Sequence, residues 1–543
     1  MEAYTKFNFS NFLKPGITSM ALLCAVVMAF GWGWRGNYGH EAGAMLPGAL
    51  MAMAAVFGSG REDWYRRTLI IGLFGAIGWS FGGSMSYMEH NYYITSDSFP
   101  DVAYGYFGFG FIALLWTGVG AAILALAFTK RISELEKYVH VALVIASFWF
   151  LEYLYFVLLP DQNIAFQRFG VEVFNDSEWF AALTTLLISS VYWLLRPKER
   201  KEAALYVRCA VGWWVGYLTL TKFGGLELAP PNRSESWGGN LGILVVLLVH
   251  HYNQKNRAAL MFTNYAMLIG PIAYIIAVFI HLPVRIGWLG IPSVFAWKLA
   301  EEGFGFFMGL GIALGIAKFI KGGLAKIPDD GNKKHLDLLS AFFLVIVMMV
   351  LNLQKNVIDW GNRYHILPDG PNYGLFAWQW FLLTALFCIG VVIYCMWLYH
   401  KGKLILVPKT AVEKGIVLFM ILITISLVGI AGHRINDWKP GNNVIEYVSY
   451  FFLAFLTIFI LITTEGNKDH LESPPTPVSF PEDKKWNLSW KFWRWWSVVP
   501  ILIVLTTLLT LGMDDGSYPM KRKRFGPDAY WRQMQKQAEE LKK

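Results

Sequence analysis

The stretch ITSMALLCAVVMAFGWGWRGNYGHEAG, residues 17–43, is an apolar run that ends in glycines, tryptophans and a group of polar side chains. Its apolar part is long enough, as a helix, to cross the hydrocarbon core of a membrane. The spacing Gly31-x-Gly33-x-x-Gly36 matches the dinucleotide-binding fingerprint, which also needs a preceding strand and an acidic residue about twenty positions further on. Residues 51–57 read MAMAAVF and contain no acid. We therefore interpret these glycines as helix-packing and turn positions at the end of a membrane helix.

The composition of the whole chain agrees with this interpretation. Of its 543 residues 55% are hydrophobic and only 16% are charged, and the mean hydropathy is +0.41. The apolar residues occur in long blocks, which is typical of an all-α polytopic integral membrane protein. The 24 tryptophans fit aromatic belts at the ends of many helices. A net charge of +9 follows from basic cytoplasmic loops, so we expect the lipid bilayer as a partner and no nucleic acid.

Apolar runs of spanning or near-spanning length recur along the chain. They centre on residues 17–34, 42–58, 68–88, 103–128, 138–159, 179–196, 204–221, 237–251, 260–282, 297–320, 337–353, 375–399, 415–432, 447–464 and 497–512. These runs predict a bundle of about fifteen transmembrane helices with short loops and Gly-rich helix packing. Two Gly- and Trp-rich hairpins, which begin near 77 and 211, also suggest weak internal repeats.

Five segments follow from these runs. They are a cytoplasmic N-terminus at 1–16, the main helical bundle at 17–464, a Pro-rich cytoplasmic loop with a Trp-rich interfacial end at 465–496, a last transmembrane helix at 497–512 and a charged C-terminal tail at 513–543. The tail is a candidate contact for a protein partner.

The charges in the loops predict the orientation. Lys and Arg gather in alternate loops, at 61–67, 130–137, 196–201, 255–257, 321–334 and 401–414, whereas the loops at 89–101 and 161–178 are acidic. Because basic loops stay in the cytoplasm, this alternation places the N-terminus inside and predicts a cell membrane, most simply a bacterial inner membrane. One stretch departs from the pattern. The sequence KRKR at 521–524 lies outside if fifteen helices span the membrane.

No known catalytic or metal-binding motif is present in the sequence. It has no HExxH, GxSxG or Walker motif, and its four cysteines, Cys24, Cys209, Cys388 and Cys395, lie in apolar segments without a CxxC pair. We therefore expect no metal site, no cofactor and no disulfide framework, and we cannot name a catalytic residue.

Polar side chains with binding chemistry gather at the predicted outer helix ends. The candidate substrate-binding residues are Arg35, His40, Glu41, Glu89, His90, Lys222, Glu227, Arg233, Asp359, Arg363, His365, His433, Arg434 and Asp437. Glu301, Glu302 and Asn352 belong to the same mixture. Any single one is more often a solvated loop residue or an interfacial side chain than a ligand contact. As a group, Arg, acids, Asn, His and aromatic residues predict a polar pocket for a hydrophilic or lipid-linked solute, with sugar-like chemistry as a guess.

Three classes of function remain open. A secondary transporter of a hydrophilic organic solute is favoured by the number of Gly-rich helices and the lack of a long soluble domain. A membrane-embedded enzyme with an extracytoplasmic active site, such as a glycan- or acyltransferase with a lipid-linked substrate, is favoured by the one-sided clustering of polar residues. A structural or assembly subunit of a membrane complex would use the charged tail and the tryptophans as contacts. We predict the transporter first.

Overall fold

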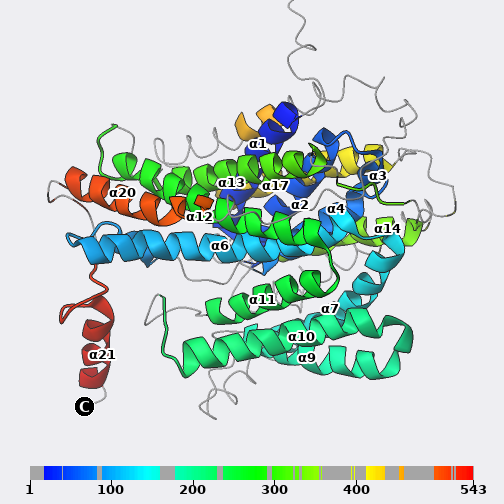
Figure 1. Ribbon diagram of the computed structural model, residues 1–543, viewed down its shortest axis with the longest axis horizontal. Coiled ribbons are helices and arrows are strands. Elements are labelled where there is room, and N and C mark those ends of the chain that lie inside the picture. The colour runs from blue at the N-terminus through cyan, green and yellow to red at the C-terminus, as the bar shows by residue number, and fades with distance from the viewer. Residues whose placement is uncertain are drawn as a thin grey trace, which may run out of the picture. The chain divides into compact units, whose positions relative to one another are not determined.

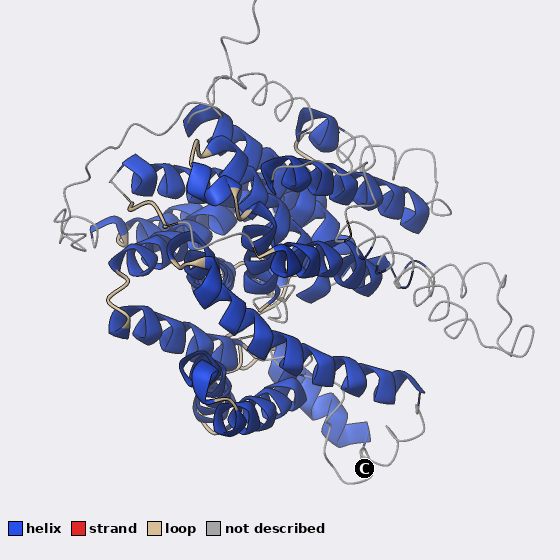
Figure 2. Cartoon of the chain, turned by 90° about the vertical axis from the view of Figure 1, so that its right-hand side faces the viewer, coloured by secondary structure: helices blue, strands red, loops and turns tan. Residues whose placement is uncertain are grey.

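The computed structural model is helical throughout the part of the chain that it describes (Figures 1 and 2). The described residues are 17–38, 41–81, 89–158, 178–228, 236–289, 296–321, 324–328, 333–353, 411–434, 452–457, 494–514 and 521–541, with the single positions 356, 390, 393, 397, 401, 516 and 518. The prediction of an all-α protein is therefore confirmed.

Six of the described helices are long and apolar enough to cross a membrane. They are α1 (Ile17–Tyr38), α6 (Phe99–Thr129), α12 (Arg257–Arg285), α13 (Ala296–Lys321), the helix Lys334–Leu353 that contains α14 (Lys334–Phe342) and the π-helix η5 (Phe343–Val347), and α17 (Ala411–Arg434). A further pair passes the same test but is bent by 118°, namely α9 (Glu178–Leu195) with α10 (Arg200–Gly216) and its π-helical continuation η3 (Tyr217–Lys222). The predicted number of about fifteen spans stays a prediction, since 375–399 and 447–464 lie mostly outside the described residues.

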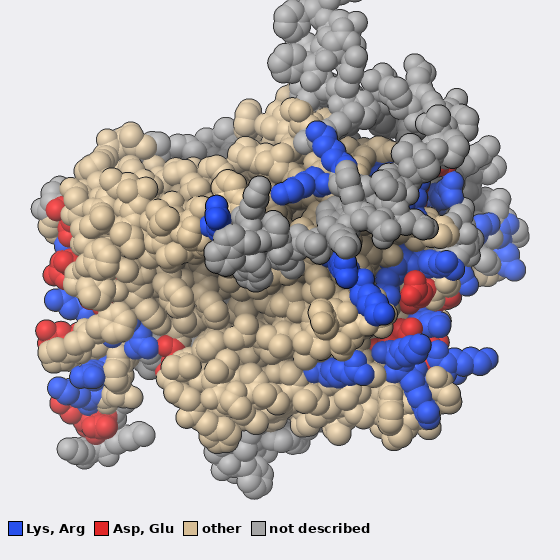
Figure 3. Space-filling view, viewed as in Figure 1, with Lys and Arg blue, Asp and Glu red and all other residues tan. Residues whose placement is uncertain are grey.

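Large apolar side chains also lie on the outside of the helices. Leu195 is 72% exposed, Phe223 is 83% exposed and Val428 is 68% exposed. Uncharged residues make up most of the described surface on the face drawn in Figure 3. Such surfaces are unfavourable in water and are accommodated by lipid, so they support a membrane-spanning protein.

The chain divides into two compact units, Met1–Gly83 with Ile272–Asn487 and Ser84–Pro271 with Leu488–Lys543. In the first unit, α1 packs against both α2 (Glu41–Gly58) and α13, and α2 packs against α4 (Thr68–Ser80). Glycines allow these close approaches. A Cβ at Gly31 would lie 2.6 Å from the Cα of Pro47, and Gly305 and Gly309 abut the backbone of α1 at Met28 and Cys24. These pairings show that α1 runs antiparallel to both of its neighbours.

A buried ion pair lies in the first unit just beyond the C-terminal end of α2. Arg61 and Asp63, at the start of the short helix α3 (Glu62–Tyr65), pair through Arg61 Nη2 and Asp63 Oδ2 at 2.6 Å, and both side chains are 7% exposed. Arg61 also donates to the carbonyls of Leu324 (2.7 Å) and Ala325 (2.8 Å), and Asp63 accepts from the backbone amide of Ile327 (3.0 Å). The pair therefore ties the loop after α2 to the segment after α13.

In the second unit, α5 (His90–Tyr93) precedes α6, which is followed by α7 (Ile132–Leu158), α9, α10 and α11 (Trp237–Asn253). Helices α10 and α11 cross where each carries a GxxxG sequence: Gly212 abuts Gly242, and Gly216 abuts Gly238. Helix α20 (Val498–Met513) packs along α6, and Tyr106 Oη lies 2.7 Å from Thr510 Oγ1. Thus α20 ends beside the beginning of α6, and the chain leaves it toward α5.

The basic stretch at 521–524 lies against the acidic segment 89–101, both in the second unit. Arg522 pairs with Glu89 and Lys523 with Asp97, so the tail lies at the same end of α6 as this acidic loop. The side of the membrane on which this end lies remains a prediction.

Candidate functional site

Arg35 and Glu301 are among the most deeply buried charged residues in the described part of the first unit. Arg35 lies in the last turn of α1 and Glu301 near the beginning of α13, and the antiparallel packing of these helices brings them together. Arg35 Nη1 lies 3.3 Å from Glu301 Oε1, and the two side chains are 1% and 2% exposed. Gly36 makes room for the carboxylate, because any Cβ there would collide with Glu301 Oε2. An ion pair shielded from water in this way is costly unless further polar groups solvate it.

Neighbouring polar and aromatic groups solvate the pair. Trp297, one turn before Glu301, donates its indole N–H to Glu301 Oε1 at 3.1 Å. The Arg35 guanidinium lies 5.9 Å from the ring centre of Trp32, within the range of a cation–π contact. Lys298 Nζ donates to the carbonyl of Gly33 at 2.9 Å and adds a second cation to this helix end. Arg35 and Glu301 thus form a charged group bordered by tryptophans, where α1 ends and α13 begins.

Two asparagines extend this polar region along α1. Asn352 accepts from the indole N–H of Trp34 (3.2 Å) and donates to the carbonyl of Ala42 (3.0 Å). Asn356 donates to the carbonyl of Gly429 in α17 at 2.8 Å. Carboxamides at these positions bind backbone carbonyls and an indole, so they hold helix ends together and leave few groups for a ligand.

Of the predicted site residues in the first unit, Arg35 alone has a described side chain. Glu41 begins α2, and His433 and Arg434 end α17, as backbone positions only. His40, Asp359, Arg363, His365 and Asp437 lie outside the described residues. Their part in the predicted pocket stays a prediction.

In the second unit, Glu89 and Glu227 contact the C-terminal strap, which we define as residues 521–525. The Arg522 guanidinium pairs with the Glu89 carboxylate and lies between two tyrosine rings, 4.0 Å from the centre of Tyr92 and 3.9 Å from that of Tyr530. The backbone carbonyl of Glu227 accepts from Arg524 Nη2 at 2.9 Å. These predicted substrate-binding positions therefore bind the chain's own tail.

Asp101 anchors the strap a second time. Its Oδ1 accepts the backbone amides of Arg524 (2.7 Å) and Phe525 (3.0 Å), while Ser98, the N-cap of α6, donates its hydroxyl to Oδ2. Lys523 lies 3.5 Å from Asp97 in an exposed pair. Both charge signs gather around α21 (Tyr530–Leu541) and the residues before it in Figure 3. The Asp101 carboxylate thus binds both the N-cap residue of α6 and the backbone of the strap.

His90 lies fully buried in this region. Its ring is surrounded by Tyr93, Tyr104 and Phe109, and Gly108 is flush with it, because a Cβ there would collide with the imidazole. Neither ring nitrogen has a hydrogen-bond partner among the described residues. Burial lowers the pKa of His90 to about 3, and the nearby Arg524 cation acts in the same direction. The imidazole is therefore neutral at physiological pH.

Lys222 and Arg233 are not brought to this group by any described contact. Lys222 ends η3, is exposed and lies 5.4 Å from the ring centre of Tyr217, while Arg233 lies outside the described residues. The side chain of Glu227 is exposed, so its contribution to the strap is its carbonyl alone.

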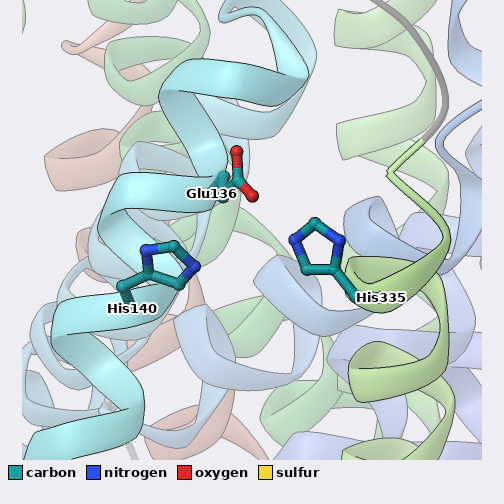
Figure 4. A group of neighbouring side chains, drawn as sticks. All are labelled: Glu136, His140 and His335. Carbon is teal, nitrogen blue, oxygen red and sulfur yellow. The ribbon is translucent and has the colours of Figure 1, made fainter.

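Glu136 and His140, which lie one turn apart on α7, are drawn in Figure 4. His140 Nδ1 is 3.3 Å from Glu199 Oε1, so this imidazole has a carboxylate partner within the second unit. The third labelled residue, His335, belongs to α14 of the first unit. We assign no common site to residues of different units.

Sequence reasoning did not select the partners that complete these clusters. The sequence places Glu301 among the polar helix ends, but it does not indicate that Trp297 and Lys298 lie beside the same charges. A signal was present in the Trp297-x-x-x-Glu301 spacing, which places an indole donor and a carboxylate on one helix face. A second was the match between KRKR at 521–524 and the acidic segment 89–101.

No protein-family model, no curated protein and no solved structure matches this chain.

Proposed function

We propose that this chain is a secondary transporter of a hydrophilic organic solute and that Arg35 and Glu301 are its central charged contacts. The observation that supports this is the ion pair itself, buried between two helices of membrane-spanning length. Two well-packed apolar side chains would hold such helices together at least as well, because the desolvation of a buried pair offsets most of its attraction. Ionisable groups at membrane depth are for this reason candidates for function.

The chemistry of the pair suits a solute that bears both acceptors and donors. The guanidinium offers donors in a fixed plane to an oxygen-rich group, and the carboxylate accepts from a hydroxyl or an amine. Trp32 and Trp297 offer faces for an apolar ring or a cation. In the absence of solute the two charges neutralise each other. When the solute binds, it replaces each partner, so no unpaired charge is left in the membrane.

A membrane-embedded enzyme is the second candidate, and His90 is the observation that favours it. Its neutral imidazole has no hydrogen-bond partner among the described residues, and it becomes a usable proton acceptor when exposure raises its pKa toward 6.5. Tyr93, Tyr104 and Phe109 cover the ring, so this function requires that cage to open before a substrate reaches it. The transporter also needs an opening movement, because Arg35 and Glu301 are 1% and 2% exposed, but its two charged contacts already pair with each other, and it therefore remains our first proposal.

The test is uptake into proteoliposomes that contain the purified full chain. Radiolabelled glucose, glutamate, glycerol 3-phosphate and uridine serve as probes, with wild type, Arg35→Lys, Glu301→Gln and Arg66→Ala in parallel. Arg66 is the matched control because it forms an exposed ion pair with Glu62 in the same unit. We expect uptake of at least one probe, lowered about tenfold or more by the Arg35 and Glu301 changes and unaltered by Arg66→Ala.

A double variant separates transport from stability. Arg35→Leu/Glu301→Leu removes both charges, so neither is left unpaired, and its thermal unfolding should stay near that of wild type. If this variant still transports the probe that wild type transports, the pair has a structural role and the proposal is wrong. Absence of uptake of every probe by wild type would also count against it.

A further inference from the structure

The Arg522 side chain makes contacts that are not needed to anchor the strap. Arg524 and Phe525 donate backbone amides to Asp101, Arg524 donates to the carbonyl of Glu227, and the Trp531 indole donates to the carbonyl of Arg524 at 3.2 Å. These contacts hold the chain in place without the Arg522 side chain. The Arg522 guanidinium instead lies against Glu89, Tyr92 of α5 and Tyr530 of α21, and we call the place that it occupies the recess.

Three side chains border this recess. The Arg522 guanidinium lies over the rings of Tyr92 and Tyr530, and Glu89 supplies the carboxylate. Tyr530 is positioned by its own backbone, since its amide donates to the carbonyl of Lys523 at 2.9 Å and Gly526, at φ +86°, turns the chain back. Removal of the Arg522 side chain alone would therefore leave a slot of the thickness of a guanidinium plane.

The recess is also open to solvent. The side chain of Arg522 is 23% exposed and that of Glu89 is 14% exposed. A planar cation that contacts two aromatic rings and a carboxylate is the arrangement in which proteins recognise a guanidinium ligand. An ammonium ion gains less there, because it lacks the plane that stacks on both rings.

We propose that Glu89, Tyr92 and Tyr530 form a binding site for the guanidinium group of a small solute, and that Arg522 is its resting, exchangeable occupant. A small solute rather than a basic peptide is favoured, because Asp101 and the Glu227 carbonyl, which a peptide would also need, stay occupied by the strap when Arg522 turns away. The inference goes beyond the transport proposal, and the site would bind its ligand in a chain that transports nothing.

The experiment is equilibrium dialysis of the purified full chain against radiolabelled methylguanidinium. Arg522→Ala opens the recess, Arg522→Ala/Glu89→Gln removes its carboxylate, and Arg532→Ala is the control, because Arg532 lies on α21 and its guanidinium faces Trp531 instead of Glu89. We expect Arg522→Ala to bind about tenfold more tightly than wild type and than the double variant. Wild type should show weak, saturable binding, reduced by the fraction of time that Arg522 occupies the recess. Arg532→Ala should match wild type.

Hydrogen exchange of the Arg524 and Phe525 amides shows whether the strap stays docked in each variant. If Arg522→Ala releases the strap, Arg522→Met, which keeps the aliphatic stem, replaces it in every comparison. Equal competition by methylammonium, or equal binding by the double variant, would overturn the proposal. So would the absence of saturable binding to wild type, because Arg522 would then be a fixed tie. Binding only of the peptide Lys-Arg-Lys-Arg-Phe, with loss of amide protection, would assign the surface to a protein partner and also contradict it.

Discussion

Single residues decide how close the charged groups of the first unit can approach. Gly36 is the clearest case, because its missing side chain is the space that Glu301 occupies. A methyl group at this position displaces the carboxylate and separates it from Arg35, which then remains charged and buried.

We expect Gly36→Ala to lower the free energy of unfolding by about 1–3 kcal/mol through overpacking. Gly512→Ala is the matched control, since nothing lies within 4 Å of a Cβ at that position and alanine is the better helix former. Thermal unfolding in detergent measures both. An unchanged midpoint for Gly36→Ala would show that Glu301 can relocate without cost.

The buried His90 imidazole predicts that the stability of the second unit, with its docked strap, depends on pH. The pKa of His90 is about 3 in the folded protein and 6.5 in the unfolded chain, so the unfolded state binds the proton first as pH falls. The contribution of the neutral imidazole to stability is complete above pH 6.5 and decreases as pH is lowered from 6.5 toward 3.

We expect protection of the strap amides to fall by up to about tenfold per pH unit within this window. Hydrogen exchange corrected for the intrinsic effect of pH measures the change. In His90→Phe, which keeps an aromatic ring in the cage, this component should disappear. A pH profile identical to that of wild type would show that His90 is not the titrating group.

Elements in this protein are joined by glycine contacts within apolar layers and by buried ion pairs at helix ends. The pair between Arg61 and Asp63 belongs to a loop that the sequence marks as basic and cytoplasmic, yet both side chains are buried and hold the segment after α13. The neighbouring pair between Glu62 and Arg66 is exposed.

We expect Asp63→Asn to destabilise the first unit by about 3–5 kcal/mol, because it leaves Arg61 buried without its counter-charge. Glu62→Gln, one residue earlier, should cost only about 0–1 kcal/mol. Unfolding in a graded denaturant checks the contrast. Similar effects of the two changes would show that the Arg61 guanidinium reaches water when its partner is lost.

For the helices, the sequence predicts their positions in the chain well and their packing partners poorly. The apolar run at 103–128 corresponds to α6 and the run at 297–320 to α13, because the length of a membrane helix is dictated by the bilayer. Partners depend on the shape of small-residue faces, so the contact of Gly216 with Gly238 was not predicted. Likewise, Arg35 was predicted from its cost within a membrane, whereas its pairing with Glu301 required the packing of α1 on α13.

On the scale of the whole chain, the docked strap fixes a topological relation within the second unit. Residues 89–101 and the tail lie at the beginning of α6, and the loop at 130–131 lies at its other end. If α6 spans the membrane, the tail and the loop are on opposite sides.

We expect single cysteines at Asp97 and Gln537, in a background without the native cysteines, to react with an impermeant thiol reagent from the same side of sealed vesicles. A cysteine at Arg131 should react only from the other side. If the cysteine at position 537 reacts from the same side as the cysteine at position 131, the tail does not stay docked in the membrane. The loop-charge pattern further predicts that the side of Arg131 is the cytoplasm.

The second unit is discontinuous in the chain, because Ser84–Pro271 is completed by Leu488–Lys543. During synthesis, the acidic segment before α6 is therefore inserted long before the arginines that neutralise it have been made. Until then Glu89 and Asp101 lack their basic partners, and α6 lacks its neighbour α20. Assembly of this unit thus cannot finish during translation of its first part. A nascent chain interrupted before residue 488 would present a characteristic uncovered surface, by which chaperones or membrane proteases could distinguish it from the finished protein.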